Sequence, residues 1–307
     1  MTAAVRGWTR AMPGVFVLIW ATGFVAARLG MPHAPPMSFL ALRFGFSVLC
    51  FLAWIAVARA RWPRDRAQWG HLAVTGVLMH AGYLAGVWSG IKAGIGAGTM
   101  ALIVGLQPVL TAIWLTRSES HGAVKVSAVQ WLGLALGLAG LALVVSRKLG
   151  IGEVTAWNLG LALLALLSVT SGTLYQKRHV APCDVRTARA IQLTAALAVS
   201  LPFALAESER VAWHPDLVIA MAWSVLGLTL GGSSLLYLLI QRGAATSVAS
   251  LMYLVPPCTA LMAWALFGEA FTPVMLAGMA LALVGVALVV RNAAPVPRPL
   301  PQEPSAS

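Results

Sequence analysis

Charged residues are scarce in this chain, since Asp, Glu, Lys and Arg make up only 10% of its 307 residues, against about 25% in an ordinary soluble domain. Hydrophobic residues make up 59%, and the mean hydropathy is +0.83. So much apolar surface cannot be confined to one buried stripe per helix, so it must meet lipid as well as protein. The composition excludes a water-soluble single domain and indicates a polytopic membrane protein.

Cysteine is almost absent. Cys50 and Cys258 lie in apolar runs, Cys183 lies in a polar one, and no pair has the C-x-x-C spacing. This excludes a disulfide framework and a zinc or redox centre of the usual kind, so we expect no cofactor and no metal. The net charge of +12 comes from 21 Lys and Arg spread between apolar runs, as in the loops of membrane proteins. We therefore expect a lipid bilayer, not nucleic acid, as the partner of these cations.

Ten apolar runs of 17 or more residues can be read along the chain. Their lengths suit a hydrocarbon core of about 30 Å at a helical rise of about 1.5 Å per residue. They are rich in Leu, Ala and Gly, which favours helices over barrel strands. The predicted fold class is therefore all-α, with ten transmembrane helices. The runs are 12–28, 37–58, 69–88, 94–116, 126–146, 157–176, 187–205, 217–240, 244–267 and 273–290.

The distribution of Lys and Arg predicts the orientation. With the N-terminus inside, 14 of these residues fall on the cytoplasmic side and five fall outside, namely Arg28, Lys92, Arg147, Lys148 and Arg210. The positive-inside rule therefore places both termini in the cytoplasm of a cell whose inner membrane holds the protein. Arg43 and Arg189 lie within spans. The tail 293–307 is rich in proline and is predicted to be a disordered cytoplasmic segment.

The two halves of the chain resemble each other. At a shift of 145 residues, LGLALGLAGLALVV (132–145) falls on AGMALALVGVALVV (277–290), and at a shift of 148 Pro108 falls on Pro256. Five spans per copy is an odd number, so the second copy must enter the membrane from the opposite side. The predicted domains are an inverted pair of five-helix repeats, 1–148 and 149–292. Inverted repeats of this kind are typical of secondary transporters.

Short motifs add a family resemblance that covers nearly the whole chain. They are Trp20, Leu42-Arg43-Phe44 and the Leu-rich segment ending in Pro108, followed by MYLVP (252–256), LFGE (266–269) and LAGMALALVGVALVV (276–290). With these the chain resembles the EamA-type branch of the drug/metabolite transporter superfamily. It departs from that pattern at LTRSES (115–120), where members of the family often have Gly-Glu. The resemblance implies a 5+5 helix carrier and says almost nothing about its substrate.

We therefore expect a secondary transporter that exports a small metabolite by alternating access, with an amino acid or a related organic anion favoured. The alternatives are a carrier of another solute class, such as a nucleotide sugar, sugar or drug, and a sensor or assembly factor with the same fold. No paired carboxylates, metal cluster or nucleophile with its base occurs in the apolar runs, so an enzyme is not expected. Whether the protein is a monomer or a weak homodimer stays open.

Polar residues at depth in the bilayer are the candidates for a site, because an uncompensated charge there is costly. None of the nine Asp and Glu lies in the middle of a span. Arg43 lies six residues into the second span, and at a shift of 149 its counterpart is Gln192. Arg43 could anchor a substrate carboxylate through its planar fork of donors. Equally, its stem could snorkel outward or its guanidinium could cap helix carbonyls.

His80 lies near the middle of the third span, and Tyr83 follows three residues later on the same helix face. The ordinary pKa of histidine is about 6.5, which would allow proton coupling through His80. A neutral histidine hydrogen-bonded between helices is the alternative. Because no carboxylate lies at mid-depth, we favour passive transport.

Two further binding residues and two prolines complete the predicted site. Trp20 lies near the centre of the first span, where its indole N–H needs a partner that lipid cannot supply, so it could line a cavity or simply pack. Tyr253 adds a hydroxyl in the second half, whereas Trp88, near a span end, is expected to be an interfacial anchor. Pro108 and Pro256 each remove a backbone donor and so predict kinks, which could be structural or could be hinges.

Overall fold

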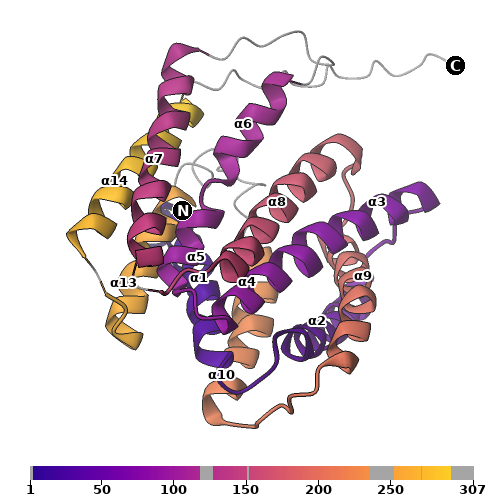
Figure 1. The fold of residues 1–307 in the computed structure, drawn as a ribbon. Helices are drawn as coiled ribbons and strands as arrows, with labels where there is room; N and C mark the ends of the chain where they lie inside the picture. The colour runs from indigo at the N-terminus through magenta and orange to yellow at the C-terminus, as the bar shows by residue number, and fades with distance from the viewer. Residues whose placement is uncertain (1–2, 118–126, 151, 236–251, 271, 292–307) are drawn as a thin grey trace, which may run out of the picture.

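The computed structural model describes residues 3–117, 127–150, 152–235, 252–270 and 272–291, and all regular structure within them is helical. The helices pack against one another in one bundle (Figure 1). Six of the described helices are long and apolar enough to cross a membrane. The elements are α1 (Ala3–Gly30), α2 (Pro36–Ala58), α3 (Arg66–Gly76), η1 (Val77–Gly82), α4 (Tyr83–Lys92), α5 (Ala97–Val104), α6 (Gln107–Arg117), α7 (Ala128–Gly150), α8 (Ala156–His179), α9 (Val185–Ala206), α10 (Pro215–Ala222), η3 (Trp223–Gly232), η4 (Met252–Leu254), α13 (Val255–Phe267) and α14 (Pro273–Arg291).

The all-α prediction agrees with this structure. Shorter apolar helical segments lie at Gly14–Gly30, Ala97–Thr111, Val255–Phe267 and Pro273–Leu288, in addition to the six long ones. Parts of the eighth and ninth predicted spans fall in 236–251, outside the described residues. The predicted disordered tail, 293–307, also lies outside them.

Three predicted spans are not continuous α-helices. The third span runs as α3, the π-helical turn η1 and α4, and the eighth runs as α10 followed by the π-helical η3. The fourth span is two helices, α5 and α6, separated at Gly105 and Leu106 just before Pro108. π-Turns widen a helix locally and occur frequently at functional sites. The third and eighth spans therefore have non-standard backbone in their central parts.

One end of the bundle, which we name the carboxylate end, carries Glu153, Glu207, Glu209, Asp216 and Glu269. Several of these carboxylates accept hydrogen bonds from orphan N–H groups at helix N-termini, which is where negative charge is stabilising. Glu207 accepts from the backbone nitrogens of Met37 and Ser38 at 2.9 and 2.7 Å, at the start of α2. Glu269 accepts from Ala97 N at 2.9 Å, at the start of α5.

The opposite end of the bundle, which we name the arginine end, lies where α2, α6, α8 and α14 finish and α3, α7 and α9 begin. Its described loops and helix ends carry Arg59, Arg61, Arg64, Arg66, Arg178 and Arg186. Gln68 in α3 donates to Ala181 O at 2.8 Å and thereby ties the α2–α3 loop to the α8–α9 loop. Five of the seven acids among the described residues thus lie at the carboxylate end, whereas cations occur at both ends and are in excess at the arginine end.

Close helix pairs hold the bundle together. α2 packs along α9, α7 packs along α14, α5 packs on α13, and α8 packs on α3 and α4. Glycines permit the closest of these approaches between α7 and α14, whose two ribbons run side by side in Figure 1. A Cβ atom on Gly278 would lie 2.7 Å from Gly140 O, and a Cβ atom on Gly285 would lie 2.5 Å from Gly133 O. These glycines therefore act in helix packing, as small residues do in membrane bundles.

Candidate functional site

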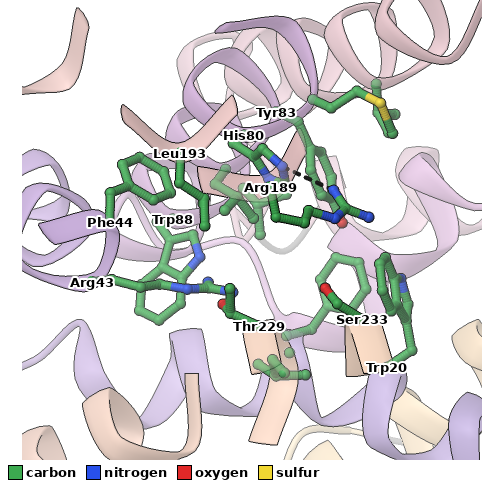
Figure 2. Close-up of a pocket in the computed structure, with 17 residues that line it drawn as sticks. Trp20, Arg43, Phe44, His80, Tyr83, Trp88, Arg189, Leu193, Thr229 and Ser233 are labelled. Carbon is green, nitrogen blue, oxygen red and sulfur yellow. Dashed lines mark hydrogen bonds between the residues drawn. The ribbon is translucent and has the colours of Figure 1, made fainter. Parts of the chain in front are cut away.

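A cavity of about 120 Å³ lies between helices from both halves of the chain. Its volume is close to the roughly 150 Å³ of an apolar cavity that binds benzene, so it can accommodate a small molecule. Figure 2 labels ten of the residues that line it. Polar groups come from Trp20, Arg43, His80, Tyr83, Arg189, Thr229 and Ser233, and the aromatic wall includes Phe24, Phe44 and Trp88.

Arg43 enters the cavity from α2 and is only 8% exposed. Its Nη2 atom donates to Thr229 Oγ1 at 3.3 Å, and its guanidinium carbon lies 5.9 Å from the ring centroid of Trp88. Thr229 in turn donates to the backbone oxygen of Ser224 at 2.8 Å, so its lone pairs remain free to accept from Arg43. Among the described residues, Arg43 Nε is buried without a hydrogen-bond partner. Arg43 therefore has donor capacity left for a ligand.

A second guanidinium reaches the cavity from α9. Arg189 Nη1 lies 3.1 Å from His80 Nε2 and 3.1 Å from Gln192 Oε1. A guanidinium can only donate, so His80 Nε2 must accept, and the imidazole is neutral with its proton on Nδ1. Figure 2 shows Arg189 beside His80 and Arg43 beside Thr229, on different sides of the space between them. The cavity thus contains two cationic side chains, one from each half of the chain.

The local backbone explains why His80 and Arg189 meet. His80 lies in the π-turn η1. This turn begins directly after Gly76, the last residue of α3. A Cβ atom on Gly76 would lie 2.5 Å from the Cα atom of Gln192, so a side chain at residue 76 would push α3 away from α9. The missing side chain lets the two helices approach closely enough for His80 to contact Arg189.

Most of the residues predicted from the sequence come together here. Trp20, Arg43, His80 and Tyr83 all line the cavity. Gln192 is 3% exposed and does not line it, and instead accepts the hydrogen bond that orients Arg189. Tyr253 lies in η4, but its side chain lies outside the described residues.

The two predicted hinge prolines lie away from this cavity. Pro108 is the second residue of α6, after the break at Gly105 and Leu106, and Pro256 is the second residue of α13, after the 3-10 turn η4. A Cβ atom on Gly105 would lie 2.9 Å from Pro256 Cγ, so the interrupted segments pack on each other. Pro256 lines a separate space of about 20 Å³ together with Leu106 and Met252. Neither proline is among the described residues that line the central cavity, and their role as hinges stays a prediction.

Sequence reasoning missed Arg189 and Thr229 as site residues, and its interpretation of Trp88 was wrong. Trp88 is 1% exposed and stacks on Phe39 with ring centroids 4.2 Å apart, so it is a wall of the cavity and not an interfacial anchor. Trp157 is 71% exposed, as an anchor would be. A signal for Arg189 was present, because it is a charge within a span. Nothing in the sequence singled out Thr229, whose position depends on the π-helical turn.

No carboxylate faces the two arginines among the residues that line the cavity. The segment 236–251, outside the described residues, also contains no Asp or Glu in its sequence. An adjoining hollow of about 270 Å³ shares Ser233 with the cavity and includes Asp184. Arg186 donates to both oxygens of Asp184, at 2.9 and 2.7 Å, and thereby lowers the pKa of this carboxyl group. That carboxylate is already paired, so within the described part of the chain no carboxylate balances the positive charge of the cavity.

Comparison with known proteins finds similarity to a transporter family and to proteins named as transporters. The EamA-like transporter family matches residues 15–146 and again residues 156–291. The transporter YvbV of Bacillus subtilis is 26% identical over 89% of this chain and 88% of its own. A probable amino-acid metabolite efflux pump of Salmonella typhimurium is 24% identical over 88% and 90%. The inner membrane transporter YedA of Escherichia coli K12 is 26% identical over 94% of both chains.

The fold has also been seen in a crystal structure. That chain is 19% identical, and it aligns over 91% of this chain and 95% of its own with a TM-score of 0.62. At this identity the likeness shows the fold alone. The two family matches, by contrast, cover most of the sequence and confirm the resemblance carried by the short motifs. The chain belongs to the EamA-like transporter family.

Proposed function

We propose that this protein is an inner-membrane secondary carrier that exports a small organic anion by alternating access through the central cavity. The observation that carries the proposal is the pair of guanidinium groups, Arg43 from the first half and Arg189 from the second, in a cavity without a carboxylate. Relatives named as transporters and efflux pumps support transport and its outward direction.

Pseudo-symmetry supports two inverted five-helix repeats, 1–148 and 149–292. The family matches twice, once in each half. The π-turn η1, at 77–82, falls on 227–232 at a shift of 150, and these residues lie inside the π-helical η3. At a shift of 145, Gly133 and Gly140 correspond to Gly278 and Gly285, and their close contacts are reciprocal. Reciprocal contacts of this kind are what a two-fold axis between α7 and α14 produces.

The contacts at the two ends of the bundle support a cavity that is closed toward the carboxylate end and accessible from the arginine end. At the carboxylate end, Lys92 Nζ donates to Met31 O at 2.9 Å and to Glu209 at 2.7 Å, which clasps the α1–α2 loop to the α9–α10 loop. On the other side of the cavity, the adjoining hollow with Asp184 and Arg186 leads toward the arginine end. The excess of fourteen cations over five supports a cytoplasmic position for the arginine end. Impermeant thiol labelling of a cysteine introduced at residue 62 tests this orientation.

The charge of the cavity selects the substrate class. A zwitterionic amino acid would bring an ammonium group beside two guanidinium groups, with no protein carboxylate to receive it, whereas an anion neutralises part of the positive charge. Hydrogen bonds between ionised groups are about twice as strong as neutral ones. The aromatic wall suits an apolar body. The favoured substrate is therefore a small carboxylate with an apolar side chain.

A matched pair of ligands tests this proposal. In proteoliposomes, we expect 2-oxoisovalerate to be transported and to bind about tenfold more tightly than valine, a free-energy difference of about 1.4 kcal/mol. Glucose serves as an uncharged control. Preference for glucose or for a nucleotide sugar would favour the other solute classes. Absence of flux for every compound, from protein that is folded and monodisperse, would favour a sensor or assembly factor.

The state of His80 supports passive transport, because protonation of its Nε2 atom would break the hydrogen bond from Arg189 and place two cations side by side. We expect that an imposed pH difference alters the flux modestly and drives no uphill accumulation. His80→Gln, which keeps a neutral acceptor, should retain transport. Uphill accumulation that is lost in His80→Gln would show proton coupling through this residue and contradict the passive mechanism.

A further inference from the structure

Three metal-ligating side chains from two separate loops meet at the carboxylate end. His33 lies in the α1–α2 loop, His214 is the N-cap residue of α10, and Asp216 lies in the first turn of that helix. One ligand atom from each of the three residues can be chosen so that all lie within 4.8 Å of one another. His33 is far from His214 and Asp216 in the chain, and the three residues share no motif, which is why the sequence alone predicts no metal.

Backbone contacts fix the two loops against each other. Ala212 N donates to His33 O at 2.8 Å, and α1 packs on α10. The imidazole rings of His33 and His214 are stacked, with centroids 4.2 Å apart and an interplanar angle of 11°. The packing of one loop from the first half on one from the second therefore brings the three side chains together, and one imidazole must rotate out of this stack before both rings can direct a nitrogen at a common ion.

The distances within the cluster are unusual for hydrogen bonds. Asp216 Oδ2 lies 3.6 Å from His33 Nε2 and 3.4 Å from His214 Nδ1, whereas good N–H···O hydrogen bonds span about 2.7–3.2 Å. In a tetrahedral zinc site with bonds of about 2.0–2.1 Å, neighbouring ligand atoms lie about 3.3–3.4 Å apart. The carboxylate oxygen is therefore already near the ligand-to-ligand spacing of a zinc site from both imidazoles.

We propose that His33, His214 and Asp216 bind a divalent transition-metal ion, with Zn²⁺ as the best fit and water as the fourth ligand. Two imidazoles and one carboxylate suit Zn²⁺, Co²⁺, Ni²⁺ or Cu²⁺, and they are a poor set for Ca²⁺ or Mg²⁺, which need mostly oxygen ligands. The side chains are 24%, 50% and 42% exposed, which leaves room for entry of the ion and for a bound water.

His214 has one competing contact. Its Nδ1 atom accepts from Asp216 N at 3.2 Å and so caps α10. Binding through Nδ1 exchanges this long hydrogen bond for coordination, while rotation of the ring presents Nε2 instead. Both routes leave His33 and Asp216 as ligands, so these two positions give the cleanest test of the site.

Titration of the purified full-length protein, carrying no polyhistidine tag, tests the proposal. We expect one Zn²⁺ per chain by calorimetry, a higher melting temperature with Zn²⁺ but not with Mg²⁺, and the visible absorption of tetrahedral Co²⁺. His33→Ala and Asp216→Asn should each weaken Zn²⁺ binding at least tenfold and abolish the Co²⁺ spectrum. His71→Ala is the matched control, because His71 is bonded to Tyr175 in α8 and is not part of the cluster.

Unchanged Zn²⁺ affinity in His33→Ala and Asp216→Asn would overturn the proposal, as would the absence of Zn²⁺ binding to the folded wild-type protein. Neither result depends on transport, so they leave the proposed carrier function untouched. If that function also holds, the bound ion ties together two loops that must separate during alternating access. Zn²⁺ should then slow substrate flux in wild-type vesicles and not in His33→Ala vesicles.

Discussion

Replacement of Arg43 by glutamine is expected to lower the affinity for carboxylate substrates by about 10- to 150-fold. Hydrogen bonds to charged groups contribute about 1.5–3 kcal/mol each, and about 1.4 kcal/mol corresponds to a factor of ten in affinity. The guanidinium is buried and its Nε atom has no partner among the described residues, so a ligand can take up this capacity. Binding of 2-oxoisovalerate to the purified variant, followed by thermal shift, measures the change.

Two companion variants separate substrate binding from a purely structural role of Arg43. Arg43→Lys keeps the positive charge but loses the planar fork, so it should recover only part of the affinity. Thr229→Val removes the protein partner of Arg43 while the guanidinium stays in place, and should change affinity much less than Arg43→Gln does. If instead Arg43→Gln and Thr229→Val lose melting temperature together and carboxylate binding per folded molecule is unchanged, Arg43 only joins α2 to η3.

Substitution of Gly285 by valine should have the largest effect on stability. The new Cβ atom would lie 2.5 Å from both Gly133 O and Gly137 N, which belong to the backbone of α7 and cannot rotate away. The two helices would have to separate along their contact, and overpacking of this kind costs about 1–3 kcal/mol and occasionally more. We expect a clear fall in melting temperature and in the yield of monodisperse protein from detergent.

Gly160→Val provides the matched control. Gly160 is also helical, in α8, and a Cβ atom there would have no neighbour within 4 Å. Both substitutions carry the same intrinsic change in helix propensity, so the difference between them reports the clash. Equal melting temperatures for the two variants would contradict the close packing of α7 on α14.

The candidate site was only partly predictable. Arg43, His80 and Trp20 were found because a polar or amphipathic group at depth in a bilayer is expensive, and this cost can be read from the sequence. Arg189 was visible as a charge near a span end but could not be distinguished from an interfacial cation. The prediction that Trp88 is an interfacial anchor was wrong, because the position of a residue along a helix does not say which face of that helix is covered by protein.

Composition and hydropathy by themselves indicated an all-helical membrane protein, because the free energy of moving apolar side chains from water is local and additive along the chain. The resemblance to the EamA-like family came instead from short motifs, and the family matches confirmed it. The tertiary structure alone decided which side chains meet. Contact between His80 and Arg189 depends on a π-turn and on the missing side chain of Gly76, and the cluster of His33, His214 and Asp216 depends on two loops packed together. Such contacts join residues far apart in the chain, and their geometry is set by helix packing that no local pattern encodes.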